Sequence, residues 1–331
     1  MSPSPANHTA TGFSLAGKKH PCCRQKGVAL VLVLWVIVLL TVIAGAMAIS
    51  QQAGVSMVSN TKQERQGRAL AAAGIQFMTL QLEQRNRPAE EQAYRVDGQL
   101  RPWQFAGHTI WIGAMPDIGR VNLNLADEKL LAGLLLATGL DEEQMESIRD
   151  AILDWRDKDS DHRLAGAEDD AYEADGRPIG ARDDVFQSVE ELQQVLGVTP
   201  ALYTQLAPML TVHSKQSKVN PAYANIDVLY SIPGITAEEV QAYVAARLQA
   251  LEQGLPVPAP EGPYGQYFST GVGSVFRVFA EIDLESGGKV EAEVIMDSEL
   301  RTKKGYKILE RNYSPLQNFG RAMNFLAEET G

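Results

Sequence analysis

The residues best suited to chemistry lie in one acidic stretch near the middle of the chain. The candidate metal ligands within it are Asp154, Asp157, Asp159, Asp161, Glu168, Asp169 and Asp170. Carboxylate oxygens without histidine or cysteine ligands suit a hard cation and disfavour zinc. The stretch therefore predicts a calcium site, of one or two ions, and the alternative is a solvated acidic turn without a fixed metal.

The spacing in this stretch partly matches a calcium-binding loop of the EF-hand type. Oxygen ligands are expected at the first, third, fifth and twelfth positions, which are Asp157, Asp159, Asp161 and Glu168. Leu164 supplies the apolar eighth position, but His162 stands at the sixth, where glycine is usual. The residues after Glu168 look acidic and loop-like rather than helical. We therefore expect the cation in a loop that need not follow EF-hand geometry.

A long helix is predicted before this region. Residues 28–49 carry no charge, which is length enough to cross a bilayer, and four Lys/Arg residues precede them. The helical pattern continues through residues 51–85, which lack proline, and Pro88 is a plausible stop. The apolar face expected on this continuation is Leu70, Ala73, Phe77 and Leu80.

Strand-like sequence flanks a helical block that holds the acidic stretch. Segments 103–105 and 108–114 are predicted strands, and 275–296 alternates as two strands joined by a two-residue turn at Gly287-Gly288. The expected inward faces are Phe276, Val278, Ala280, Ile282 and Leu284, then Val290, Ala292, Val294 and Met296. A third strand is expected near 306–309. The pattern predicts an α+β fold, a long helix packed on an antiparallel sheet, with an inserted α-helical domain.

The helical block contains a weak internal repeat. One copy starts at Val121-Asn122 and has Gly139 at its centre, and the second starts at Val219-Asn220 and has Gly234 there. These units resemble helix-hairpin-helix modules, which often bind the DNA backbone through the amides of the glycine turn. Acidic residues flank both turns and oppose DNA binding. The resemblance to helix-hairpin-helix modules leaves one alternative function, a membrane-anchored DNA-binding protein of a competence or type IV pilus system.

Net charge, cysteine positions and missing catalytic motifs further limit the class of protein. The net charge is −11, and without the four basic residues before position 28 the remainder stands at −15, which repels nucleic acid and favours cations. Both cysteines precede position 28, so the body has no disulfide. No metalloprotease, serine-hydrolase or phosphate-loop motif occurs, and the sequence indicates a non-enzymatic protein.

The start of the chain allows three interpretations. It is an uncleaved signal anchor, a secretory signal cut near Ala46 or Ala48, or a leader cut directly after Gly27 so that the apolar helix is retained. Lys26-Gly27 followed by such a helix resembles the type IV pilin-like family. That resemblance implies cleavage between Gly27 and Val28 by prepilin peptidase and methylation of the Val28 amine.

Position 32 departs from the pattern of that family. The fifth mature residue is usually Glu, whose carboxylate pairs with the amine of a neighbouring subunit in the apolar filament core, but here it is Leu32. The first mature residue, usually Phe or Met, is Val28. A subunit without the carboxylate fits best at a filament end. Together with the helical insertion, this departure resembles the K family of minor pseudopilins in type II secretion systems.

The resemblance to the K family carries expectations about role and place. It implies a non-enzymatic subunit at the pseudopilus tip, which initiates or caps assembly for protein export across the outer membrane. The implied partners are minor pseudopilins I and J, the rest of the pseudopilus, prepilin peptidase and the inner membrane, with no nucleic acid. The implied location is a single pass through the inner membrane, with the N-terminus cytoplasmic and the body periplasmic.

The same resemblance adds detail to the metal site and the domain layout. Family calcium sites correspond here to residues 154–159 and 166–169, and Asp183 is a further possible oxygen ligand. The expected domains are a leader (1–27), a membrane helix (28–49), a first part of a pilin-like domain (50–120), an inserted α-helical domain (121–254) and a second pilin-like part (255–331).

Overall fold

The computed structural model describes residues 28–84, 94–253, 255–299 and 305–313. The chain divides into two units, 1–60 and 61–331, and each is described by itself. The predicted leader with Gly27, and Pro88 as a helix stop, lie outside the described residues.

The first unit contains the start of helix α1, which runs from Val28–Glu83. Residues 29–47 of this helix are long and apolar enough to cross a membrane, judged by length and composition alone. Their side chains are exposed, and Leu32 is among them. A helix with no polar face along this length is typical of a membrane anchor.

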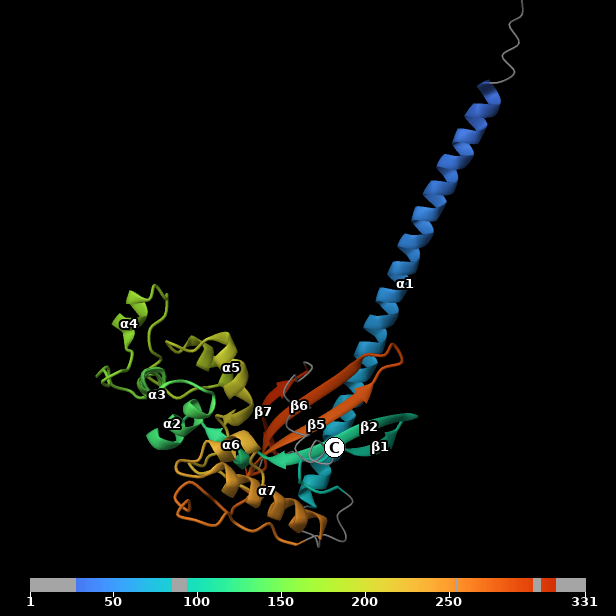
Figure 1. Cartoon of the computed structure of the whole chain (residues 1–331). Helices are drawn as coiled ribbons and strands as arrows, with labels where there is room; N and C mark the ends of the chain where they lie inside the picture. The colour runs from blue at the N-terminus through green and yellow to red at the C-terminus, as the bar shows by residue number, and fades with distance from the viewer. Residues whose placement is uncertain (1–27, 85–93, 254, 300–304, 314–331) are drawn as a thin grey trace, which may run out of the picture. The chain divides into compact units, whose positions relative to one another are not determined.

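The second unit contains a five-stranded antiparallel sheet against which the later part of α1 packs (Figure 1). The strand order is β1-β2-β5-β6-β7. The strands are β1 (Arg101–Phe105), β2 (His108–Pro116), β5 (Val275–Asp283), β6 (Lys289–Asp297) and β7 (Lys307–Asn312). The predicted mixture of helix and antiparallel sheet is confirmed, and the inward faces predicted for β5 and β6 form its core.

The face of α1 that contacts the sheet agrees with the prediction in part, since Leu70 is buried and Phe77 packs against the core. The buried side chains are Leu70, Ala71, Ile75, Met78 and Leu82, whereas Leu80 is 57% exposed. Two helical glycines explain the choice of face. A Cβ at Gly67 would lie 2.8 Å from side-chain atoms of Leu284 and Val290, and one at Gly74 would lie 2.9 Å from Ile110. The helix therefore turns its glycine-bearing side to the strands because only that side permits close approach.

The turn between β5 and β6 also differs from the prediction. Asp283 pairs with Lys289, so five residues rather than two connect the strands. The Leu284 amide donates to the Gly288 carbonyl, and the Gly287 amide donates to Leu284. Gly287 adopts a φ of 83°, which a longer loop of this kind requires.

Helices fill the chain between β2 and β5. The α-helices are α2 (Glu128–Ala137), α3 (Glu142–Arg156), α4 (Asp169–Ala174), α5 (Pro200–Leu206), α6 (Ile226–Tyr230) and α7 (Ala237–Glu252). Short 3-10 turns η2 (Asp117–Gly119), η3 (Val189–Gln194) and η4 (Ala207–Met209), and strands β3 (Val121–Asn122) and β4 (Leu210–Thr211), connect them. These elements share one apolar core, separate from the core under α1.

The internal repeat seen in the sequence is a structural repeat of two helical hairpins, α2/α3 and α6/α7. Each opens with an asparagine whose side chain accepts from a following amide: Asn122 from Asn124 at 2.9 Å, and Asn220 from Ala222 at 2.9 Å. Each first helix is capped by an Asx side chain, Asp127 or Asn225. This shared frame positions the acidic stretch, which follows directly from the end of α3.

Candidate metal centre

The last turn of α3 fixes the first carboxylate of the site. Asp154 is fully buried, and the adjacent Trp155 is buried among Tyr172 and Phe186, at ring-centroid distances of 5.7 and 6.0 Å. Arg156, next in sequence, donates to the carbonyls of Leu123, at 2.5 Å, and of the loop before α2. The end of α3 is therefore anchored on two sides, and Asp154 has a defined direction.

Arg163 lies between the first two carboxylates. Its Nη1 donates to Oδ1 of Asp154 and, at 2.5 Å, to Oδ2 of Asp157. Its backbone amide also donates to Asp154 Oδ2 at 3.3 Å. These bonds to two carboxylates raise the pKa of Arg163 against the opposing effect of burial. The guanidinium thus supplies positive charge at this point of the loop.

Glu168 and Asp183 form an acidic cluster with Asp154 and Asp157, in which Asp154 and Glu168 are buried and the other two are half-buried. Glu168 is 4% exposed, and its burial, followed by repulsion from Asp154 and Asp183, raises its pKa to about 7. Burial and the charges of Asp169 and Asp157 likewise raise the pKa of Asp183. Asp183 adopts a φ of 53°, a left-handed conformation that is uncommon outside glycine and asparagine-like residues.

Three carboxylate oxygens of the cluster are buried without a hydrogen-bond partner. They are Oδ1 of Asp157, Oε1 of Glu168 and Oδ1 of Asp183. Unpartnered buried acceptors are costly, and each needs a donor or a cation. The donor set contains oxygen only, so the residues present fit a hard cation such as calcium.

The described side chains do not yet stand at ligand spacing. No three acidic, histidine or cysteine side chains within the described ranges already form a metal cage. Arg163 forms ion pairs with Asp154 and Asp157 and holds both carboxylates against its own guanidinium. A cation and Arg163 would therefore compete for the same carboxylates.

Two glycines permit the close packing of these loops. A Cβ on Gly166 would lie 1.8 Å from Oδ2 of Asp154, and a Cβ on Gly180 would lie 1.8 Å from Oδ1 of Asp169. Any side chain at either position would push a carboxylate out of place. Gly180 and Arg163 are the site residues that sequence reasoning missed, although an arginine and a glycine among so many acids are a visible signal.

The predicted ligands separate into two groups. Asp154, Asp157, Glu168 and Asp183 converge, and Asp169 lies beside them. Asp170 is exposed and contacts His162 at 2.8 Å. Asp159 is exposed and accepts from the amide of Asp161 at 3.1 Å, and its charge also contributes to the raised pKa of Asp183.

The loop departs from EF-hand geometry, as the sequence-based expectation allowed. Leu164, at the position that is apolar and buried in such a loop, is 104% exposed. Helix α4 starts at Asp169, so a helix does follow Glu168, contrary to the sequence-based expectation. The physical reason is that Asp154, from inside α3, and Asp183, from a later loop, face Glu168 instead of the third and fifth positions.

A second polar cluster lies where the helical block meets the sheet. The Arg277 guanidinium donates to Asp117 at 2.5 Å and to Glu293 at 2.9 Å, and all three side chains are buried. Burial alone would raise the pKa of Asp117, but Arg277 reverses this and lowers it. The charges are paired with one another, which indicates a structural role.

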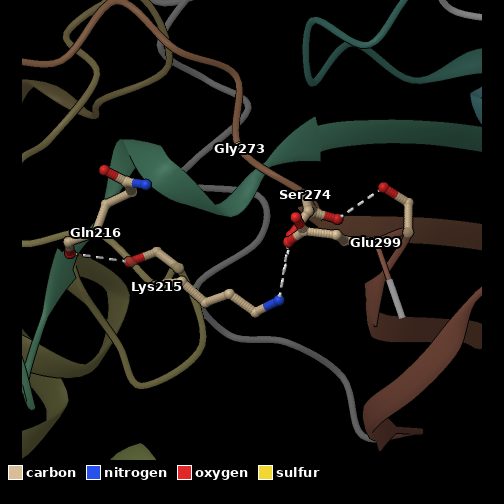
Figure 2. Close-up of a pocket in the computed structure, with 7 residues that line it drawn as sticks. Lys215, Gln216, Gly273, Ser274 and Glu299 are labelled. Atoms are coloured by element: carbon tan, nitrogen blue, oxygen red, sulfur yellow. Dashed lines mark hydrogen bonds and ion pairs between the residues drawn. The ribbon is translucent and has the colours of Figure 1, made fainter. Parts of the chain in front are cut away.

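A polar cavity of about 400 Å³ lies nearby (Figure 2). Its lining residues are Ser214, Lys215, Gln216, Gly273, Ser274, Ser298 and Glu299. The Lys215 ammonium is 2.5 Å from the buried Asp297 and 3.4 Å from Glu299, so its charge is already neutralised. The cavity offers no free charge for an anion or a metal, and the acidic cluster stays the candidate site.

Comparison with known proteins finds a family similar to the helical block. A family model described as "Type II secretion system (T2SS), protein K" matches residues 119–215, which include α2, α3 and the acidic cluster. Over this stretch the chain is similar to protein K of type II secretion systems. The matched stretch lies within the helical block and contains the first hairpin and the acidic loops.

Relatives and a solved structure agree with this assignment. A type II secretion system protein K of Pseudomonas aeruginosa is 25% identical over 242 residues, covering 67% of this chain and 72% of that one. A protein K of Escherichia coli K12 is 27% identical over 204 residues, covering 57% of this chain and 62% of that one. A chain in the crystal structure of the GspK-GspI-GspJ complex from enterotoxigenic Escherichia coli is similar in fold, with a TM-score of 0.55 at 16% sequence identity. The match covers 78% of this chain and 98% of that one.

Proposed function

We propose that this protein is a non-enzymatic minor pseudopilin at the tip of the type II secretion pseudopilus. The observation that carries the proposal is the family's helical block, inserted between β2 and β5 of a domain in which a helix packs on an antiparallel sheet. This is the arrangement expected of a pilin-like domain with an added α-helical domain. The chain would initiate or cap assembly for export across the outer membrane.

Leu32 supports a terminal position in the filament. A carboxylate in the apolar core is tolerated when it pairs with the amine of a neighbouring subunit, and a subunit that lacks it cannot neutralise such an amine. The side chain here is an exposed leucine on a helix apolar enough to span a membrane. At a filament end no preceding amine needs a partner, so leucine carries no penalty there.

The proposed surroundings follow from this role. Prepilin peptidase would cut between Gly27 and Val28 and methylate Val28, and the helix would cross the inner membrane once with the body in the periplasm. The related structure is of a GspK-GspI-GspJ complex, which supports the I and J minor pseudopilins as partners of this chain. Nucleic acid is not proposed as a partner, because acidic residues flank both hairpin turns.

Calcium is the proposed ligand of the acidic cluster. The three unpartnered oxygens and the raised pKa of Glu168 both reflect carboxylates held together without enough positive charge. Calcium would supply that charge through Asp154, Asp157, Glu168 and Asp183, with Asp169 as a further oxygen donor. It would clip together a long irregular region that no disulfide holds.

The tip position is tested by locating the protein on purified pseudopili. An epitope label on the full chain should appear at filament ends only. Mass spectrometry of the same material should find methylated Val28 as the first residue. Label along the filament shaft, or a first residue near position 47, would contradict the proposal. Tight binding of duplex DNA at low salt would favour the DNA-binding alternative.

The calcium site is tested by calorimetric titration of the full chain in detergent. Asp154→Asn should weaken calcium binding about tenfold or more, since it replaces a fully buried carboxylate. Asp170→Asn is the matched control, because Asp170 is exposed and contacts His162 outside the cluster. Arg163→Ala should strengthen binding by removing the competing cation. Equal affinities for Asp154→Asn and Asp170→Asn would contradict the site.

A further inference from the structure

Two basic side chains of the helical block reach the sheet from one short segment. His213 and Lys215 follow β4 and are separated by one residue. The Nε2 atom of His213 lies 3.2 Å from Oε2 of Glu310 on β7. The Nζ atom of Lys215 lies 2.5 Å from Oδ2 of Asp297 at the end of β6. Polar contacts therefore tie the block to two neighbouring strands, and the charge of one of them depends on a proton.

A β-bulge in β7 directs Glu310 toward the helical block. Two adjacent residues of β6 pair with Ile308 and Glu310, so Leu309 between them is an extra residue in the strand. In a regular strand, Ile308 and Glu310 would share a face, and the bulge separates them. Ile308 packs against the core under α1, whereas Glu310 contacts His213 on the other face. The bulge is therefore the feature that makes this contact possible.

Glu310 is held in its ionised form by the groups around it. Its hydrogen bond with His213 is the largest influence on its pKa and lowers it, while burial opposes this effect. Asn312, which donates to Oε1 at 2.7 Å, and the charge of Arg277 lower the pKa further. A proton that is gained or lost near neutral pH is therefore carried by the imidazole and not by this carboxylate.

The charges around the His213–Glu310 pair are unequal in number. The titratable groups that surround the pair from the neighbouring elements are Asp117 and Arg120 at η2, Tyr203 on α5, Arg277 on β5 and Glu293 on β6. Burial raises the pKa of Tyr203, so this side chain is neutral. With Glu310 included, three carboxylates face two guanidiniums. A protonated His213 supplies the missing positive charge, and only then are the charges balanced.

We propose that His213 and Glu310 form a proton-dependent latch, which holds the helical block on the edge strand β7 when His213 is protonated and loosens when it is neutral. Protonation turns the contact into a charge-assisted hydrogen bond, which is stronger than one to a neutral imidazole. The latch therefore stabilises the contact at mildly acidic pH and loses this effect as the pH rises through the range in which histidine titrates. This device goes beyond the proposed tip role and depends neither on filament position nor on calcium.

Amide hydrogen exchange of the full chain in detergent tests the latch at about pH 5.5 and about pH 7.5. Exchange is expressed as protection factors, which remove the intrinsic effect of pH on the exchange rate. The amides of β7 and of residues 210–213 should be protected about threefold less at the higher pH. His213→Gln should show the lower protection at both pH values. His213→Arg, which is charged at both, should keep the higher protection at both.

A second histidine of the chain provides the matched control. His108 on β2 is half-buried, as His213 is, and its Nε2 lies 3.2 Å from the neutral amide of Gln66. His108→Gln should therefore keep the pH dependence of the unaltered chain. Glu310→Gln should abolish this dependence, because the carboxylate that attracts the protonated imidazole is gone.

Comparison between variants separates the latch from the acidic cluster. Glu168 also titrates in this range, but it is present in every variant, and calcium is kept constant. Protection that does not fall with pH in the unaltered chain, or a fall that persists in His213→Gln, would overturn the proposal. Loss of the pH dependence in His108→Gln would overturn it as well. Circular dichroism of each variant verifies that the fold is retained.

Discussion

The two helical hairpins, α2/α3 and α6/α7, share one structural frame, but only one of them leads into the acidic cluster. In each, an arginine from the second helix donates to carbonyls of the loop that opens the hairpin: Arg156 to those of Leu123 and Ala126, and Arg247 to those of Pro221 and Ala224. The distance along the chain from Gly234 to Arg247 is one helical turn shorter than the distance from Gly139 to Arg156. The first helix of that hairpin is also shorter, so the arginine still reaches the same loop carbonyls.

Only the first hairpin carries the acidic cluster. Fifteen residues after each turn glycine, the first copy has Asp154 and the second has Gln249. Helix α3 runs into the long loops that bring Glu168 and Asp183 to Asp154, whereas α7 ends at Glu252 before the proline-rich stretch. The comparison indicates that the frame is structural and that the site depends on loops added to one copy of it.

The largest expected difference concerns the two arginines. Arg247→Met should destabilise the chain by about 2–5 kcal/mol, because two buried carbonyls lose their donor. Arg156→Met should cost less, since Arg156 is only half-buried. Urea unfolding of the full chain in detergent measures both. Lysine at each position, which reaches one carbonyl at most, should give intermediate losses, and a larger loss for Arg156→Met would contradict the shared frame.

The contact between the hairpins gives the next largest effect. A Cβ on Gly133 of α2 would lie 2.0 Å from the Ser231 carbonyl oxygen at the end of α6. Gly133→Ala should therefore cost about 2–3 kcal/mol by forcing the hairpins apart. Gly139→Ala is the control, because it meets no atom within 4 Å and adds only strain at a φ of 89°. It should cost about 1 kcal/mol, and equal thermal shifts would mean that the hairpins do not meet there.

The pH dependence of stability should distinguish the acidic hairpin. With chelator present, Glu168 has a pKa of about 7 in the fold against 4.5 as a free side chain, so the folded state holds its proton longer. The free energy of unfolding should then fall by about 1–3 kcal/mol as the pH rises from about 4.5 to 7.

Glu168→Gln should flatten that slope, and calcium should oppose the loss because it favours the ionised carboxylate. Denaturant unfolding across this pH range provides the measurement. If the free energy of unfolding rose over this pH range in the unaltered chain but not in the Glu168→Gln variant, the sign would be opposite and the raised pKa of Glu168 would be refuted.

The smallest expected effect compares the caps of the two first helices. Asp127 and Asn225 each accept the amide of the residue three positions on, at 2.8 and 2.7 Å. Asp127→Ala and Asn225→Ala should each lower stability by about 1 kcal/mol. Melting temperatures of the two variants should shift alike, and a shift confined to one would show that the caps are not equivalent.

Much of the sheet was predictable because alternation of apolar and polar residues along a strand determines which side chains share a face. Phe276, Val278 and Ala280 had to share a face, and they do. On helix α1, periodicity placed Leu70 and Phe77 toward the sheet correctly but misplaced Leu80, and the close approach at Gly67 and Gly74 is the signal that fixes the buried side. The turn after β5 was misjudged because Gly287-Gly288 fits a two-residue hairpin as well as the five-residue loop observed.

The residues of the acidic cluster were all among the predicted ligands, but spacing along the chain did not separate them from the exposed acidic residues around them. Counting along one loop favoured Asp159 and Asp161, yet the fold brings Asp183 to Glu168 from a separate loop. That convergence depends on the left-handed backbone at Asp183 and on the close approach at Gly166 and Gly180, which a linear pattern does not reveal. The role of Arg163 as an internal counter-ion also requires the loop to fold back on α3.

The helical block leaves and rejoins the sheet at neighbouring points, since Pro116 at the end of β2 pairs with Phe276 at the start of β5. Closing a flexible loop of about 160 residues would cost of the order of 4 kcal/mol in chain entropy. A block that folds first and presents its two ends side by side removes most of that cost. Hairpins that fold before the sheet would hold the end of β2 close to the start of β5. We therefore expect that destabilising the hairpins slows formation of the sheet.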